Sequence, residues 1–174
     1  MRKPYGKTGM AFEDLINYTN AQYKNSQMAL INKRPTPVKV MSAKGNRVLS
    51  GYFESKSTVD YDGIYKGNAI VFEAKSIEIN RFELKNLHAH QLQYLIDAKK
   101  NGAVSFLLIE FRHLKLIYYV SVEFVSFYVR QAANGGRKSI PLVDFEVHGF
   151  EVKPGRKVAL DYLAAVDRVK ELVK

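Results

Sequence analysis

The chain has 174 residues, 47% of them hydrophobic and none of them cysteine, which predicts a single domain with a sizeable core and excludes disulfides and thiolate metal sites. No apolar run approaches the roughly 18 residues of a membrane span, and residues 1–6 carry charge without an apolar stretch behind it, so we expect a cytoplasmic protein with no membrane partner. The formal net charge of +10 favours a polyanionic partner, with nucleic acid ahead of an anionic membrane surface.

The N-terminal part combines a basic arm with a helix. Residues 1–8 are polar and basic and predict a flexible arm. Apolar side chains then recur at helical spacing from Met10 to Tyr23. Glu13 lies beside this stripe, near the boundary with solvent, where it either favours the helix dipole or reaches a site at the sheet edge. The prolines of the segment 33–37 end any helical continuation.

A basic hairpin is expected next. Val38–Met41 and Arg47–Phe53 have the composition of two strands, and residues 42–46 would connect them. This hairpin is either a projection that contacts the polyanion or a solvated turn. Its basic residues are Lys39, Lys44 and Arg47.

The segment 57–75 predicts a second β-hairpin, which carries acidic residues on both strands. Residues i and i+2 of a strand share a face, so Glu73 and Lys75 point the same way. Thr58, Asp60 and Asp62 share a face of the first strand for the same reason. The hairpin therefore gathers carboxylates and one lysine on a single face.

The register of this hairpin is open between two turns. A two-residue turn at Lys66-Gly67 places Asp60 opposite Glu73, whereas a turn one residue later places Asp62 there. Opposed carboxylates destabilise a sheet unless they are solvated or held by a cation. Two carboxylates with waters suit Mg²⁺, and Lys75 is placed to orient a water or to stabilise charge on a phosphate. The alternative is an exposed face with an ordinary Glu–Lys pair.

The remaining elements alternate between helices and apolar strands. His88 and His90 fall within the first of these helices, where a spacing of two residues separates them by about 200°, so we do not expect them to chelate one ion together. Residues 134–139 predict a flexible basic loop. The elements are a helix over 85–101, strands over 104–111 and 114–120, a helix over 122–133 and a closing helix over 159–173.

This order of elements predicts an α/β fold in which helices flank a mixed, largely hairpin-built sheet, with an α+β sandwich as the alternative. The sequence lacks a Gly-rich phosphate loop followed by a helix, a zinc pattern with His-x-Glu and a nucleophile elbow. These absences count against a nucleotide-binding fold and against the corresponding zinc and serine chemistry.

The chain resembles the RecU-type Holliday junction resolvases, a family within the PD-(D/E)XK nuclease superfamily. The resemblance spans most of the chain, and its most specific block surrounds Asp60 and Glu73. The blocks that carry it are Gly9-Met10-x-x-Glu13 with Asn17 and Asn20, Lys33-Arg34-Pro35-Thr36-Pro37-Val38, Tyr52-Phe53, Ser57-Thr58-x-Asp60-Tyr61-x-Gly63-Ile64-Tyr65-Lys66-Gly67, Phe72-Glu73-Ala74-Lys75, His88-x-His90-Gln91 and Gly136-Arg137-Lys138-Ser139.

The resemblance implies a homodimeric, Mg²⁺-dependent endonuclease, with Mn²⁺ as a substitute, that nicks four-way DNA junctions symmetrically in recombination and repair. It implies a restriction-endonuclease-like fold with a projecting stalk, here residues 36–56. Recombination proteins are further candidate partners. The aromatic runs at Tyr118-Tyr119 and 124–128 are either surface for the second protomer or part of the core.

The resemblance also assigns residues. Asp62 stands where an uncharged polar residue is common in the family, and the turn of the projecting hairpin is short. Thr58, Asp60, Glu73 and Gln91 match the metal-binding positions, Lys75 matches the transition-state lysine and Glu13 the acid of the first helix. The residues that we expect to contact DNA are Lys33, Arg34, Lys39, Lys44, Arg47, Lys56, Arg137 and Lys138.

Two rival functions remain open at this point. One is a nuclease of the same fold that cuts duplex DNA. The other is a basic module that binds nucleic acid without catalysis. Cleavage of a four-way junction beside a matched linear duplex, with and without Mg²⁺, distinguishes junction resolution from both rival functions.

Overall fold

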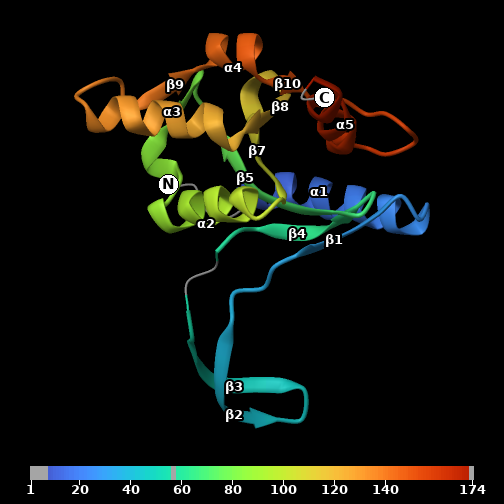
Figure 1. Cartoon of the computed structure of the whole chain (residues 1–174). Helices are drawn as coiled ribbons and strands as arrows, with labels where there is room; N and C mark the ends of the chain where they lie inside the picture. Colours follow the sequence, from blue (N-terminus) through green and yellow to red (C-terminus); the bar gives the residue numbers. More distant parts are fainter. Residues whose placement is uncertain (1–7, 56–57, 173–174) are drawn as a thin grey trace.

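A computed structural model describes residues 8–55 and 58–172, and its centre is a six-stranded mixed sheet (Figure 1). β5 and β7 are parallel, whereas the other neighbouring strands of this sheet are antiparallel. The strands, in their order across the sheet, are β1 (Ala29–Lys33), β4 (Tyr61–Tyr65), β5 (Asn68–Ile77), β7 (Val104–Phe111), β8 (Leu116–Ser121) and β10 (Phe150–Glu151).

Helices cover both faces of this sheet, and the sheet separates two hydrophobic cores. On one face, α1 (Thr8–Asn25) and α5 (Tyr162–Leu172) pack against the strands. On the other face lie α2 (Ala89–Lys100), α3 (Val122–Ala133) and α4 (Leu142–His148). This arrangement confirms the predicted α/β class with a mixed sheet flanked by helices.

The apolar run of β7 is buried on both faces, as predicted for a central strand. Phe106 and Leu108 contribute to the core beneath α1 and α5. Leu107 and Ile109 contribute to the core beneath α2 and α3. Such continuous burial explains why the run shows no polar alternation.

The predicted basic hairpin is present and projects from the body of the protein (Figure 1). It consists of β2 (Val38–Lys44) and β3 (Arg47–Phe53), and all of its residues are exposed. Lys44 pairs with Arg47, so the turn contains only Gly45 and Asn46. Gly45 has a φ of +58°, a left-handed conformation that glycine adopts at little cost. The first strand continues past the predicted end at Met41, through a bulge.

The hairpin of β4 and β5 adopts the first of the two predicted registers. Tyr65 pairs with Asn68, and the two turn residues Lys66 and Gly67 have φ values of 46° and 74°. Positive φ at both central positions is the type I′ geometry that matches the twist of paired strands. Tyr61 pairs with Phe72, so the residue before Tyr61 meets the residue after Phe72.

α2 begins four residues later than predicted. β6 (Arg81–Glu83) pairs with β9 (Ser139–Pro141), and a 3₁₀ turn (Leu84–Asn86) follows β6. The chain is held by this pairing before it reaches helical geometry at Ala89. His88 keeps extended backbone angles as the residue that caps the helix.

Other boundaries also differ from the predictions. Thr8 already belongs to α1 instead of to the predicted arm, whose other residues lie outside the described part of the chain. α5 begins at Tyr162 because the Asp161 carboxylate accepts the backbone N–H of Ala164 and starts the helix there. β1, β6, β9, β10 and α4 were not predicted.

The aromatic run of β8 is core. Tyr118 and Tyr119 are at most 5% exposed, so they offer no surface for a second protomer. Phe127 of α3, by contrast, is 49% exposed. Among the helices that the structure describes, none combines the length and apolar character needed to cross a membrane.

Candidate active site

Asp60 and Glu73 meet at the base of the hairpin formed by β4 and β5. The backbone N–H of Asp60 donates to Oε2 of Glu73 at 3.1 Å. Oδ2 of Asp60 accepts the backbone N–H of Ala74 at 3.0 Å. The hairpin register thus brings together the two carboxyl groups that the sequence indicated.

Two further side chains contact the carboxylate of Glu73. Nζ of Lys75 lies 2.7 Å from Oε1 of Glu73, and Nε2 of Gln91 donates to the same oxygen. Gln91 comes from the first turn of α2, and its own Oε1 accepts the backbone N–H of His88 at 3.1 Å. This second bond fixes the orientation of the amide, so that its N–H group points at Glu73.

The carboxyl group of Glu73 is fully buried, and its pKa reflects this. Burial and, after it, the negative charge of Asp60 raise the pKa of Glu73 from 4.5 to about 7, although the ammonium of Lys75 opposes both effects. The ionised form of Glu73 therefore costs free energy in the metal-free protein. A change from 4.5 to about 7 corresponds to roughly 3 kcal/mol.

The raised pKa predicts a pH-dependent stability. The folded state binds the proton of Glu73 more tightly than the unfolded state, so this stabilisation is complete below pH 4.5 and is lost as the pH rises towards about 7. Glu73→Gln should therefore raise the free energy of unfolding of the metal-free protein at pH 8 by roughly 2–3 kcal/mol and have little effect at pH 4.5. Urea unfolding at both pH values measures this. The exposed Glu146→Gln serves as the control, and equal effects of the two variants at pH 8 would contradict the prediction.

The donor set formed by Asp60 and Glu73 fits a hard divalent cation. Mg²⁺ is commonly held by one or two carboxylates together with waters. Repulsion between the two carboxylates contributes to the raised pKa of Glu73. A bound cation would relieve this repulsion. Among the residues that the structure describes, no three His, Cys, Asp or Glu side chains form a metal-binding cluster.

Thr58 and Asp62, the neighbours of Asp60 in the predicted acidic face, both contact Arg34. Nη1 of Arg34 donates to Oγ1 of Thr58 at 2.7 Å, and Nε lies 3.0 Å from Oδ2 of Asp62. The carboxylate of Asp62 is therefore paired with a cation, whereas that of Asp60 contacts the strand of Glu73. This difference favours Asp60 over Asp62 as the acid that works with Glu73.

Tyr94 of α2 completes the surroundings of Arg34 and was not predicted. Its hydroxyl accepts Nη1 of Arg34 at 2.9 Å, and the guanidinium carbon lies 5.3 Å from the centre of its ring. Tyr94 is three residues after Gln91, so the two share a face of the helix. This spacing is the only signal in the sequence that could have linked Tyr94 to the site.

Glu13 of α1 contacts β1 and Tyr61, the residue that follows Asp60. Its carboxylate forms an ion pair with Lys33, the last residue of β1, and its backbone carbonyl accepts the hydroxyl of Tyr61 at 3.4 Å. Both side chains of the ion pair are partly exposed. The structure thus places Glu13 beside β4 and pairs it with Lys33, a predicted DNA-binding lysine.

The other basic residues predicted to contact DNA lie in two places. Lys39, Lys44 and Arg47 are exposed on the projecting hairpin, and Arg137 and Lys138 are exposed in the loop between α3 and β9. Lys56 lies outside the described residues.

A groove of about 860 Å³ extends from the site towards the hairpin. Phe53 of β3 lines one side, and the first residues of α2 line the other, including Gln91. The rings of His88 and His90 stack there with centroids 5.5 Å apart. The prediction that they point in opposite directions was wrong, because His88 precedes the helix.

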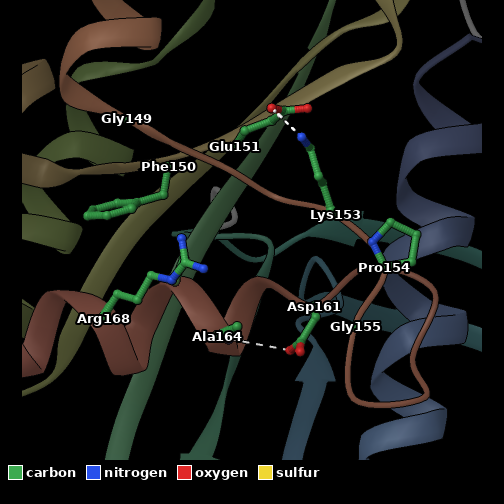
Figure 2. Close-up of a pocket in the computed structure, with 10 residues that line it drawn as sticks. Gly149, Phe150, Glu151, Lys153, Pro154, Gly155, Asp161, Ala164 and Arg168 are labelled. Carbon is green, nitrogen blue, oxygen red and sulfur yellow. Dashed lines mark hydrogen bonds and ion pairs between the residues drawn. The ribbon is translucent and has the colours of Figure 1, made fainter.

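A separate hollow of about 550 Å³ lies at the far edge of the sheet, between β10, the loop around Gly155 and α5 (Figure 2). Figure 2 shows the side chain of Arg168 beside this hollow, and Lys153 forms an ion pair with Glu151 at 2.8 Å on its rim. The hollow adjoins α5, on the face of the sheet opposite α2. It contains none of the predicted site residues.

Comparison with known proteins identifies close relatives of the chain. The sequence profile of the RecU family, described as recombination protein U, matches residues 7–168. A Holliday junction resolvase RecU from Pediococcus pentosaceus is 35% identical over 173 residues, which cover 96% of this chain and 86% of the relative. The RecU proteins of Limosilactobacillus reuteri and Listeria monocytogenes are 36% and 34% identical, over 95% of this chain and 84% and 85% of their own.

Among solved structures, Hjc of Archaeoglobus fulgidus, a Holliday junction resolvase from an archaeal hyperthermophile, aligns with a TM-score of 0.49 and 11% sequence identity. The alignment covers 80% of this chain and 94% of that protein.

Proposed function

This chain belongs to the RecU family, and we propose that it is a Mg²⁺-dependent endonuclease that resolves four-way DNA junctions. The observation that carries the proposal is the contact of Asp60, Glu73 and Lys75 on one face of the β4–β5 hairpin. The net charge of +10 supports a nucleic-acid substrate. We place this activity in the cytoplasm, where bacterial DNA is found.

The reaction that we propose is hydrolysis of a phosphodiester. A water loses a proton to solvent, and its oxygen forms a new bond to phosphorus. The bond from phosphorus to one sugar oxygen breaks, and this oxygen takes up a proton from solvent and leaves as a hydroxyl. Asp60 and Glu73 would hold Mg²⁺, with Thr58 and Gln91 next to them. When bound, Mg²⁺ activates a water and neutralises charge on the scissile phosphate.

The protein side chains divide the remaining work. Lys75 stabilises the negative charge that develops on a phosphate oxygen. Gln91 holds the carboxylate of Glu73 in a fixed orientation through its two hydrogen bonds. Glu13 orients Lys33 through their ion pair, and Lys33 would contact the DNA backbone.

The decisive test compares three substrates at equal concentration: a synthetic four-way junction, a linear duplex of matched sequence and a single strand, each with and without Mg²⁺. We expect paired nicks in the junction that require Mg²⁺, with Mn²⁺ as a substitute, and little cleavage of the duplex. Equal cleavage of the duplex would indicate a duplex nuclease. Tight junction binding without any cleavage would indicate a non-catalytic module and would contradict the proposal.

The projecting hairpin should select the branched substrate. It is narrow and basic, and a four-way junction has an open centre surrounded by phosphates that linear duplex lacks. Changing Lys44 and Arg47 together to Ala should lower the slope of log affinity for the junction against log salt by roughly 2, because each phosphate contact contributes about 0.9. Fluorescence anisotropy across a salt series measures this slope.

The same pair of substitutions should reduce the preference for junction over duplex while residual cleavage persists. The control changes Lys153 and Lys157 to Ala. Both are exposed lysines of the loop between β10 and α5, which is distant from the hairpin. If junction preference and salt slope remain unchanged in the hairpin variant, the hairpin is a solvated turn and selectivity comes from other basic surfaces.

The protein should act as a homodimer. Symmetrical resolution requires two cuts on opposed strands, and a two-fold axis supplies two equivalent sites. Light scattering at micromolar concentration should therefore give about twice the chain mass of 19.8 kDa. A monomeric mass under conditions in which junctions are cut symmetrically would refute this prediction.

A further inference from the structure

Arg34 lies where the projecting hairpin joins the sheet. It follows β1 directly, and the three residues Pro35, Thr36 and Pro37 lead from it into β2. Two prolines make this connection stiff, because each fixes its own φ angle. The second leg returns beside the first, with the backbone N–H of Glu54 donating to the carbonyl of Pro37 at 3.0 Å. The direction of the hairpin therefore depends on how Arg34 is held.

The backbone and side chain of Arg34 together contact three alternate residues of the catalytic strand, by which we mean β4 and the residues 58–60 that lead into it. Its backbone N–H donates to the carbonyl of Asp60 at 2.8 Å. Its guanidinium contacts Thr58 on one side, at 2.7 Å, and Asp62 on the other, at 3.0 Å. Asp60, whose carboxyl group faces Glu73, thus lies between two residues that the same arginine restrains.

The guanidinium also connects this strand to α2. Nη1 is shared between Thr58 and the hydroxyl of Tyr94, and the guanidinium lies over the Tyr94 ring. Tyr94 follows Gln91 by three residues, and Gln91 donates to Glu73. One side chain therefore touches the root of the hairpin, the strand of Asp60 and the helix that orients Glu73.

These contacts require the planar, forked shape of arginine. The guanidinium offers several N–H groups in fixed directions, so it can satisfy a carboxylate and two hydroxyls at once while its face covers an aromatic ring. A lysine ammonium is a single point charge and cannot meet all of these partners together.

We propose that Arg34 is a positioning residue that couples the projecting hairpin to the catalytic strand. It holds Asp60 in place against Glu73 and sets the direction in which the hairpin leaves the sheet. This role rests on the proposed nuclease function for its catalytic consequence, but its structural consequence can be measured without any cleavage.

The structural consequence is tested by a distance measurement in the metal-free protein. The chain has no cysteine, so Asn46→Cys at the hairpin turn and Gln93→Cys on α2 provide the only two sites for spin labels. Electron–electron double resonance should give a narrow distance distribution in this labelled protein and a clearly broader one after Arg34→Gln. The control is Arg112→Gln, another partly buried arginine, which pairs with Glu78 away from the hairpin. An unchanged distribution in the Arg34 variant would overturn the coupling.

The catalytic consequence is tested by separating binding from turnover. Single-turnover cleavage at saturating junction should slow by about 10- to 100-fold in Arg34→Gln, because a misplacement of about 1 Å can cost 10²-fold. The affinity for the junction, measured without metal, should stay within about threefold, and its salt slope should not change. This expectation replaces the sequence-based prediction that Arg34 contacts DNA, because Thr58, Asp62 and Tyr94 engage its guanidinium. A direct phosphate contact by Arg34 would instead weaken binding and reduce the salt slope by about 1, with the saturated rate preserved, and this result would refute the proposal.

Two milder variants keep the test decisive if Arg34→Gln folds poorly. Arg34→Lys keeps the charge and should give an intermediate rate at saturation. Tyr94→Phe removes only the hydroxyl that accepts Nη1 and should slow the saturated rate slightly, without weakening binding. Wild-type rates in both variants would overturn the catalytic part. Failure of the unaltered protein to cut junctions would count against the proposed function alone, because the distance measurement still decides the coupling.

Discussion

Glu73→Gln is expected to reduce junction cleavage to the background of the assay while junction affinity stays within a few fold of the unaltered protein. The carboxylate of Glu73 is buried at the meeting point of Asp60, Lys75 and Gln91. Its replacement by an amide removes one of the two negative charges that would hold Mg²⁺. Because an ion held there serves the chemistry and the basic surfaces serve docking, binding should survive. Asp60→Asn should behave in the same way.

The measurement pairs single-turnover cleavage with metal-free binding on the same preparation. Glu110→Gln is a matched control, because Glu110 is a partly buried glutamate of the neighbouring strand β7 that contacts Ser76 on the opposite face of the sheet. It should cut at the normal rate. Normal cleavage by Glu73→Gln would show that the site lies elsewhere in the chain. Loss of binding together with cleavage would show instead that the substitution disturbs the fold.

The centre of the site could be predicted from the sequence because strand geometry is local. The period of two places Glu73 and Lys75 on one face whatever their surroundings. The choice of register needed the turn, and the left-handed conformations of Lys66 and Gly67 decide it in favour of Asp60 opposite Glu73. Sequence reasoning alone had to leave both registers open, because each places Gly67 at a central position of a two-residue turn, where glycine is favoured.

The surroundings of the site could not be predicted because they depend on long-range packing. Arg34 and Tyr94 are 60 residues apart and meet only when α2 packs across the sheet. The boundaries of α2 depend in turn on the pairing of β6 with β9, which joins segments almost 60 residues apart. The pairing of Arg34 with Asp62 is likewise invisible in either local motif, although it separates the roles of two nearby acids.

Lys75→Met is expected to slow the saturated cleavage rate by about 10²–10³-fold, which is the usual cost of removing one preorganised electrostatic group. Lys75 has two separable effects in this site. Its ammonium lies 2.7 Å from the Glu73 carboxylate and lowers the pKa of Glu73. In the proposed reaction it also stabilises negative charge on a phosphate oxygen. Methionine keeps the bulk of the stem and removes the charge, so the loss reports electrostatics.

The two effects of Lys75 have different dependences on pH and Mg²⁺. Without the ammonium, the pKa of Glu73 should rise further, so the protein would hold a proton on Glu73 at neutral pH and bind Mg²⁺ more weakly there. Raising the pH to 9 with excess Mg²⁺ ionises Glu73 and should restore that part of the loss. A deficit of about 10²-fold or more should remain under these conditions if Lys75 stabilises the transition state. Full recovery at high pH and high Mg²⁺ would mean that Lys75 acts only by keeping Glu73 ionised. The phosphate contact would then have to be assigned to another cation.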